Sequence, residues 1–245
     1  MSKIIAILQP MYLPWLGYFE QMAIADLFVF MDDVQYTKKD WRNRNRIKTA
    51  NGPCWLTVPV RKHSRNALIR DIEINDREPW ARRHLRSIDF SYRKRPGFEP
   101  LYNDLSAALS TEPRSTPEKL WELDCRLIAL LARYLEVETP TAFSSAVPRG
   151  VMPEDKNGRI LEICQAFDAD LLYDGASAAS FIDVQRFQRE GVEVIFQDYE
   201  HPVYPQAFGE FISHMSALDL IMNTGSEAPK IFRSTMANVR GLAIA

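Results

Sequence analysis

The chain has 245 residues, of which 46% are hydrophobic and 25% charged, and its formal net charge is −2. This length suits one large domain or two small ones with a substantial core, and the charge balance gives no indication of a nucleic-acid-binding protein. No apolar run approaches the roughly 20 residues of a membrane span, and the N-terminus lacks the pattern of a signal peptide. We therefore expect a cytoplasmic protein that does not enter a membrane.

The N-terminal residues predict a strand, a helix and a second strand. Residues 3–8 are apolar and rich in β-branched side chains, and they end just before Gln9, which indicates a buried strand. Residues 12–25 can form a helix, and residues 26–31 are a second apolar run that ends at Asp32. A strand–helix–strand unit favours a parallel pair, and ligands of parallel sheets collect at the carboxyl ends of the strands.

The middle of the chain is richer in helical patterns. Residues 55–60 and 67–74 are strand candidates. Leucines then recur at helical spacing, most regularly after residue 117. Helices are predicted at residues 79–92, 98–109 and 117–135, with the weakest joint of the chain at residues 111–117.

Beyond Pro140, strands and helices alternate again. Strands are predicted at residues 141–144, 171–173 and 192–197, and helices at residues 157–167, 181–190 and 215–222. No internal repeat or low-complexity linker divides the chain. We therefore predict one α/β domain over residues 1–245, with a mostly parallel sheet flanked by helices and a helical insertion at about residues 79–135.

A basic segment follows the second predicted strand. Residues 1–100 contain 18 Lys and Arg against 11 Asp and Glu, a balance of +7, whereas residues 101–245 contain 12 against 21, a balance of −9. Guanidinium groups bind phosphate or carboxylate in a planar, two-pronged way, so the segment predicts a site for an anionic small molecule. Its candidate binding residues are Lys38, Trp41, Arg42, Asn43, Arg44, Asn45, Arg46 and Lys48, and Trp55 follows in the next strand.

The alternation of arginine and asparagine has a geometric meaning. On an extended chain, Arg42, Arg44 and Arg46 share one face and the asparagines share the other. Three guanidinium groups on one face repel each other unless an anion or carboxylates offset them. A nucleic-acid surface is the rival interpretation, but the acidic second half and the pI of about 6.1 argue against a broad polyanion footprint.

Asp32 and Asp33 are the first candidates for catalysis. They could bind a metal, orient an amine or act as a base. Side by side on an extended chain they point to opposite faces, so only one is expected to enter the site. The structural alternative is that one carboxylate pairs with Arg42 or Arg44.

Two loops supply the remaining candidates. Gln9 and Tyr12 lie between the first strand and the first helix, where a polar side chain can position a ligand; a rigid turn with aromatic packing explains this loop equally well. Asp198 and His201 could form an acid–base pair, and Tyr204 and Gln206 follow in the same loop as candidate substrate-binding residues.

Metal and thiol chemistry have weaker support. No histidine pair has the spacing of metal ligands, so no metal site is predicted. Cys54, Cys125 and Cys164 are far apart and odd in number, which suits a reducing compartment without a disulfide framework. The sequence identifies no cofactor and no oligomeric state.

The motifs that contain these residues resemble those of the WbqC-like protein family nearly from end to end. The matching segments lie at residues 7–10, 12–19, 30–36, 43–48, 55–60, 197–206 and 216–225. Many members begin the first motif with His-Gln-Pro, whereas this chain has Leu8 before Gln9. Asp174 is a further departure, since the family often has a small residue there.

The resemblance implies a biosynthetic role in surface-polysaccharide or natural-product clusters. It suggests transfer of glycine or an acyl group to a nucleotide-linked amino sugar, so we expect a transferase or ligase. In that reaction Asp32, Asp33 or His201 would accept a proton from the amine, and the arginines would hold phosphate or carboxylate. The alternative is a non-catalytic binding or scaffold protein of the same cluster. Both depend on one expectation, that the arginines and the two aspartates gather in one concave site.

Overall fold

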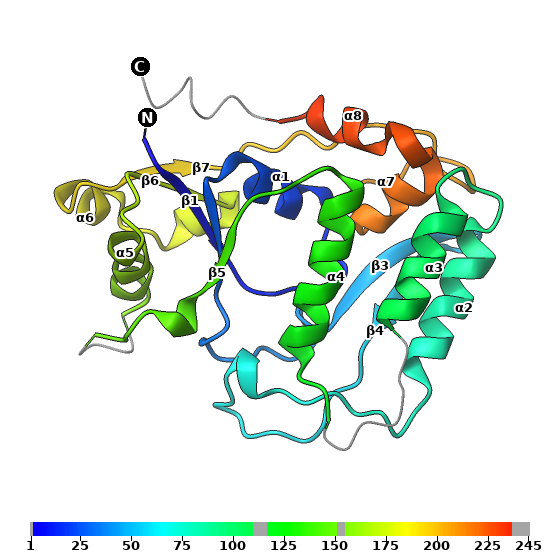
Figure 1. Cartoon of the computed structure of the whole chain (residues 1–245), viewed down its shortest axis with the longest axis horizontal. Helices are drawn as coiled ribbons and strands as arrows, with labels where there is room; N and C mark the ends of the chain where they lie inside the picture. Colours follow the sequence, from blue (N-terminus) through cyan, green and yellow to red (C-terminus); the bar gives the residue numbers. More distant parts are fainter. Residues whose placement is uncertain (1, 110–116, 151–154, 237–245) are drawn as a thin grey trace.

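The computed structural model describes residues 2–109, 117–150 and 155–236, and its centre is a parallel five-stranded sheet (Figure 1). The strand order is β5-β2-β1-β6-β7, so the first strand of the chain lies in the middle. Every neighbouring pair is parallel. The strands are β1 (Ile4–Leu8), β2 (Leu27–Phe30), β5 (Thr141–Phe143), β6 (Leu171–Asp174) and β7 (Glu193–Phe196).

Helices cover both faces of this sheet, which explains why its strands read as continuous apolar runs. Ala6, Phe28 and Phe30 belong to the same buried cluster as side chains of α1 and α4. Ile7 and Leu172 point to the other face and pack with α5 and α6. The four helices are α1 (Leu16–Ile24), α4 (Leu120–Tyr134), α5 (Lys156–Ala166) and α6 (Val184–Arg189).

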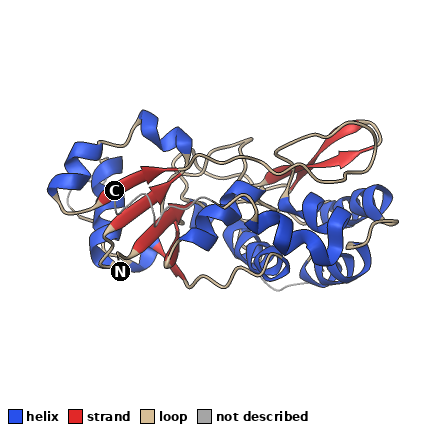
Figure 2. Cartoon of the chain, turned by 90° about the horizontal axis from the view of Figure 1, so that it is seen from above, coloured by secondary structure: helices blue, strands red, loops and turns tan. Residues whose placement is uncertain are grey.

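The segment between β2 and β5 extends away from one side of the sheet (Figure 2). It begins with an antiparallel hairpin of β3 (Arg44–Thr49) and β4 (Gly52–Thr57), whose tight turn ends at Gly52 with a φ of 90°. One apolar cluster continues from the sheet through this insertion. The insertion also contains α2 (Trp80–Tyr92) and α3 (Phe98–Ala108), and the C-terminal α7 (Ala217–Thr224) and α8 (Ala228–Arg233) pack beside it.

The predicted fold class is confirmed: the chain is α/β, with a parallel sheet flanked by helices. The three predicted helices of the insertion are α2, α3 and α4. The first helix starts later than expected, at Leu16, because Leu13 has a φ of 44° and Pro14 interrupts the preceding turn. Residues 111–116 of the predicted joint lie outside the described residues.

The strand predicted at residues 67–74 is wrong. The chain instead forms a 3₁₀ turn at Ile69–Asp71, and only isolated bridges involve Leu68 and Ile74. Ile69 and Ile72 are both fully buried although they are three positions apart. A strand would send them to opposite faces, whereas a 3₁₀ turn places both on one side.

Asp124 is an exception to the apolar packing of α4. Its side chain is completely buried, and neither carboxylate oxygen has a hydrogen-bond partner. Burial, with a smaller contribution from the charge of Glu118, raises the pKa of Asp124 well above its ordinary value. An uncompensated buried charge is costly, so the group is kept protonated in the folded chain.

We predict that Asp124→Asn stabilises the protein at alkaline pH. The folded-state pKa of Asp124 is raised, so the native state favours the protonated form, and stability falls as the pH rises above the unfolded-state pKa of about 3.9. Asparagine cannot ionise, so the variant should gain at least about 1 kcal/mol at pH 8 and less at pH 4. Denaturant unfolding at the two pH values measures the difference. The exposed Asp198→Asn is the control; an equal gain there, or no dependence on pH, would contradict the prediction.

Candidate functional site

The carboxyl ends of the five parallel strands form one polar edge. β1 leads to Gln9, β2 to Asp32 and Asp33, β5 to Ser144, and β6 ends at Asp174. From β1 the chain first adds β2 and β5 on one side of the sheet, and later adds β6 and β7 on the other side. In open α/β sheets, ligands bind outside the carboxyl ends of the strands, at the point where the strand order changes direction. The edge beside Gln9 and Asp174 is therefore the candidate site.

Asp32 and Asp33 both turn toward Ser144. The Ser144 Oγ lies 3.1 Å from Asp32 Oδ1 and 2.5 Å from Asp33 Oδ1, and the Ser145 N–H donates to Asp32 Oδ1 at 3.0 Å. Both aspartates are 3% exposed. The two side chains do not point to opposite faces as expected for an extended chain, because the chain bends after β2.

The cationic partners of Asp33 are Arg149 and Arg159, not Arg42 or Arg44 as the structural alternative proposed. Arg159 Nη2 lies 2.8 Å and Arg149 Nε 3.0 Å from Asp33 Oδ2. Burial by itself would raise the pKa of Asp33, but the Ser144 hydrogen bond and the two guanidinium groups bring it below its ordinary value. The group is therefore held as a carboxylate and is a weak base at neutral pH.

Arg42 connects the basic segment to the sheet. Its Nε donates to Gln9 Oε1, and its guanidinium also pairs with Asp40. The Tyr12 N–H donates to the Trp41 carbonyl at 3.1 Å. These contacts place the start of the β3–β4 hairpin beside the carboxyl end of β1.

The predicted alternation is present within β3, but Arg42 lies in the turn before this strand and contacts Gln9 and Asp40 instead of sharing a face with Arg44 and Arg46. Asn43 and Asn45 are buried, and their amides donate to the carbonyls of Val58 at 2.9 Å and Leu13 at 2.8 Å. Tyr12 is also buried, with its hydroxyl 2.9 Å from His84 Nδ1. These contacts show that the three side chains hold the loop in place.

Arg44 and Arg46 lie on the opposite face, against two indoles. The Arg44 guanidinium is 4.3 Å from the Trp55 ring centroid, and that of Arg46 is 5.5 Å from Trp55 and 5.7 Å from Trp41. The centroids of the two indole rings are 5.3 Å apart. Trp55 is 44% exposed and Trp41 is 37% exposed. Among the described residues neither arginine has a carboxylate partner, and the Nε of each is buried without a hydrogen bond. We call these four residues the arginine–tryptophan face.

The two lysine candidates have different surroundings. Lys38 is exposed on the loop before the hairpin. Lys48 is 1% exposed, and its Nζ donates to the Glu210 carbonyl. It therefore stabilises the loop after β7 and is not available to a soluble ligand.

Tyr204 and Gln206 also have structural partners. The Tyr204 hydroxyl donates to Asp219 Oδ2 at 2.9 Å and the Gln206 amide to the same oxygen at 2.8 Å, while the Tyr92 hydroxyl donates to Asp219 Oδ1 at 2.6 Å. Burial raises the pKa of Asp219, and these donors oppose that effect. The buried carboxylate joins α2, α7 and the loop after β7.

In this loop His201 and Tyr199 each have a buried polar atom without a hydrogen-bond partner, and His201 is the one that can accept a proton near neutral pH. Its Nδ1 lies 2.9 Å from the Pro202 carbonyl, which can only accept, so Nδ1 carries the proton and Nε2 presents a lone pair. Nε2 is buried and has no hydrogen-bond partner. Burial lowers the pKa of His201, so the imidazole is neutral at pH 7.

The predicted pairing of His201 with Asp198 is not present among the described contacts. Asp198 is exposed, and the Pro202 carbonyl is the partner of His201 Nδ1. The His201 ring instead lies 5.1 Å from His214, which stacks on Trp15 at 5.2 Å.

Trp15 brings this loop to the start of α1. A Cβ at Gly17 would lie 2.2 Å from the Trp15 ring, so only glycine lets that ring fold over the helix. Ser216, which bridges to Trp15, donates its N–H to the Arg46 carbonyl at 3.0 Å. The loop of His201 therefore packs between the first helix and the β3–β4 hairpin.

Comparison with known proteins gives one clear relationship. The family model described as "WbqC-like protein family" matches residues 9–231. The chain belongs to the WbqC-like family. It is also 38% identical over 233 residues to "Uncharacterized protein Rv1507c" of Mycobacterium tuberculosis, covering 94% of this chain and 98% of that protein. No solved structure matched.

The candidate site of this WbqC-like chain contains a carboxyl group that the sequence analysis did not select. Asp174, at the end of β6, has its Oδ1 bound to the Gly175 N–H at 2.7 Å, and burial raises its pKa to about 6. A carboxyl with this pKa can exchange protons near neutral pH. Only its position before a glycine at a strand end could have indicated it.

A second group that the sequence analysis did not select lies on the buried side of α1. Glu20 is fully buried and accepts from the Tyr173 hydroxyl at 2.9 Å and from the Gln197 amide at 2.6 Å. The same amide donates to the Gly17 carbonyl at 2.8 Å. These contacts tie α1 to the ends of β6 and β7, beneath the candidate site.

In the part of the chain that the structure describes, no three His, Cys, Asp or Glu side chains are arranged to hold a metal ion. None of the helices described there is long and apolar enough to cross a membrane.

We predict that the Asp33–Arg159 pair stabilises this edge strongly. Both side chains are about 5% exposed or less, and Arg159→Ala would leave a buried carboxylate with Arg149 as its remaining cation. The variant should lose about 3 kcal/mol or more of unfolding free energy. Arg186→Ala, which breaks a surface pair with Asp155, is the matched control and should have a small effect. Equal losses in the two variants would show that the buried pair has no special role.

Proposed function

We propose that this chain is a biosynthetic transferase or ligase that binds an anionic small molecule carrying a ring, and that the arginine–tryptophan face holds this molecule. The observation that supports this most directly is the stacking of Arg44 and Arg46 on Trp41 and Trp55 without a neutralising carboxylate among the described residues. Two adjacent cations repel each other. A phosphate or carboxylate between them would offset the repulsion.

A nucleotide-linked sugar fits this chemistry. An exposed indole can stack on a nucleobase, and guanidinium groups can hold a diphosphate in a bidentate way. Arg42 leads from this face to Gln9 at the carboxyl end of β1. A ligand bound by its phosphates at Arg44 and Arg46 would therefore direct its sugar toward the polar edge of the sheet.

We assign the role of general base to His201. In the proposed reaction an amine of the sugar attacks an acyl or aminoacyl carbonyl, a C–N bond forms, and the donor's leaving group departs with the bonding electrons. The amine must lose one proton, and the unpartnered Nε2 of a neutral imidazole can accept it. Asp32 and Asp33 then hold the ends of β2 and β5 together, because Asp32 Oδ1 and both carboxylate oxygens of Asp33 already have donors.

We predict that Arg44→Ala and Arg46→Ala each weaken the binding of uridine diphosphate at least about tenfold, since each removes a charge-assisted contact. Isothermal titration at two salt concentrations measures the effect. Arg189→Ala, an exposed arginine on α6, is the matched control and should leave the affinity unchanged. Equal affinities in all three variants would remove the arginine–tryptophan face from the site.

We predict that His201→Gln keeps ligand affinity within about threefold but lowers product formation about 100-fold, the usual contribution of a general base. Purified protein would be incubated with a uridine diphosphate amino sugar and glycyl or acyl donors, and the amide product measured by mass spectrometry. The wild-type rate should rise with pH and reach its plateau on the acid side of about 6.5, because the pKa of His201 is lowered. Binding without product in the wild type would instead support the non-catalytic alternative.

A further inference from the structure

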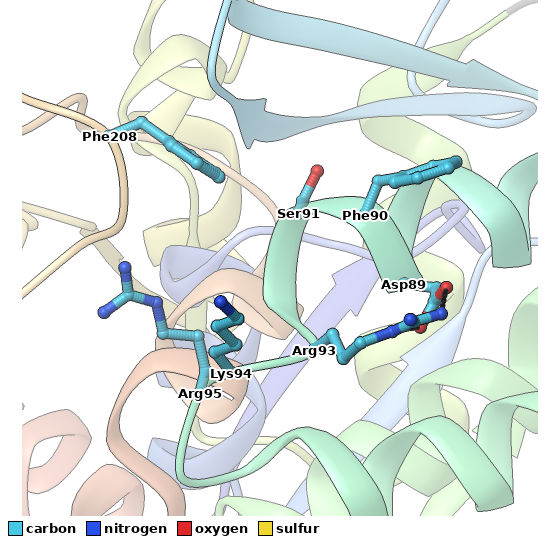
Figure 3. Close-up of a pocket in the computed structure, with 7 residues that line it drawn as sticks. All are labelled: Asp89, Phe90, Ser91, Arg93, Lys94, Arg95 and Phe208. Atoms are coloured by element: carbon cyan, nitrogen blue, oxygen red, sulfur yellow. Dashed lines mark hydrogen bonds and ion pairs between the residues drawn. The ribbon is translucent and has the colours of Figure 1, made fainter.

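A pocket at the carboxyl end of α2 is a second candidate site (Figure 3), and none of the residues that line it belongs to the arginine–tryptophan face. Its volume is about 310 Å³, within the lower part of the range of small-molecule sites. It is lined by Asp89, Phe90, Ser91, Arg93, Lys94, Arg95 and Phe208. The first six come from the helix end and the turn after it, and Phe208 comes from the loop after β7.

Two of its three cations are free to bind an anion. Arg93 is paired with Asp89, its Nε lying 2.8 Å from Asp89 Oδ1. Lys94 and Arg95 have no side-chain hydrogen bond or ion pair with any described residue. After the Asp89–Arg93 pair is set aside, the pocket has a net positive charge.

Two aromatic rings make the same pocket apolar. Phe90 is 71% exposed and Phe208 is 42% exposed, although burial of such a ring is favourable by about 1.5–3 kcal/mol. In Figure 3 the Phe208 ring reaches toward the helix end on the side where Lys94 and Arg95 extend, whereas Phe90 points away on the other side of the helix end. The Arg86 guanidinium lies 5.5 Å from the centroid of the Phe90 ring. An exposed ring beside unpaired cations, as at Phe208, indicates an amphipathic partner.

The position of Phe208 is imposed by the structure around it. Its φ is 62°, a left-handed conformation that costs energy for a residue with a side chain, and Gly209 follows with a φ of 74°. The preceding Ala207 N–H donates to the Asn223 side chain at 3.2 Å, and Gln206 is bound to Asp219. Two hydrogen bonds to α7 therefore fix the loop just before Phe208, and this holds the Phe208 ring at the pocket.

We propose that this pocket binds a small amphipathic anion, with a carboxylate or phosphate head on Lys94 and Arg95 and an apolar tail against Phe208. The free positive charge selects the head, and the exposed ring selects the tail. A cavity of this volume accommodates a free molecule, whereas a membrane or a polynucleotide would need a wide exposed surface. This inference does not depend on the proposed transferase function, because the two sites share no residue.

The test uses three probes that separate head from tail. Hexanoate has both parts, acetate has the head alone, and hexanol has the tail alone. Binding to the full-length protein is followed by amide chemical shifts in NMR titrations. Hexanoate should bind at least about tenfold more tightly than either acetate or hexanol, with shifts at the residues that line the pocket.

Variants then identify the residues. Phe208→Ala and the double variant Lys94→Ala/Arg95→Ala should each weaken hexanoate binding about tenfold, and Arg189→Ala should leave it unchanged. The charge-reversed variant Lys94→Glu/Arg95→Glu should lose hexanoate binding and gain binding of hexylammonium. Since all four substituted side chains lie at the surface or line the pocket, circular dichroism would confirm that each variant is folded.

Three results would overturn the inference. Acetate binding as tightly as hexanoate would reduce the pocket to a basic surface, and undiminished binding in Phe208→Ala would exclude the ring. Sedimentation of the protein with anionic phospholipid vesicles, lost in Phe208→Ala, would identify a membrane surface as the partner instead. Failure of uridine diphosphate to bind at Arg44 and Arg46 leaves these outcomes unaffected.

Discussion

The central position of β1 is the constraint on which the rest of the structure depends. β1 pairs with β2 on one side and β6 on the other, and both of its faces lie under helices. The backbone of β1 is therefore hydrogen-bonded on both sides, and its side chains are packed on both faces. A ligand can reach this strand only at its carboxyl end. Arg42 reaches Gln9 at this end, and this contact attaches the β3–β4 hairpin to the sheet.

The same position explains the polar groups that are buried near the edge. A parallel sheet covered on both faces leaves its strand ends inside the protein, so each carboxylate there needs donors. Asp33 has Ser144, Arg149 and Arg159, and Glu20 has Tyr173 and Gln197. These contacts join elements that are more than 100 residues apart in the chain, and they stabilise the edge without being part of the proposed chemistry.

The fold class could be predicted from the sequence because strands and helices are indicated by the pattern of neighbouring residues. Apolar runs such as Ile4–Leu8 and the leucine pattern of α4 depend on neighbouring residues, and the strand–helix order then implies a parallel sheet. The 3₁₀ turn at Ile69–Asp71 was missed because a short apolar run does not distinguish a strand from a buried turn. Partners such as Arg159 for Asp33 could not be predicted, since 126 positions separate the two residues and nothing in the intervening sequence specifies their contact.

The basic segment illustrates the same limit at the level of function. Its alternation correctly separates Arg44 and Arg46 from Asn45, because that depends only on the extended conformation of β3. It is wrong for Arg42, which lies in the turn before this strand. The alternation also predicts that Lys48 shares the face of Arg44 and Arg46. The two arginines contact exposed indoles, whereas Lys48 is buried by the loop after β7, and the pattern does not predict this difference.

That loop carries both His201 and Phe208, and Asp219 binds Tyr204 and Gln206 between them. The candidate base and the ring at the carboxyl end of α2 are thus parts of one segment that is anchored to α7. The Tyr204 hydroxyl and the Gln206 amide donate to the same carboxylate oxygen, so neither side chain can shift without changing the hydrogen bonding of the other.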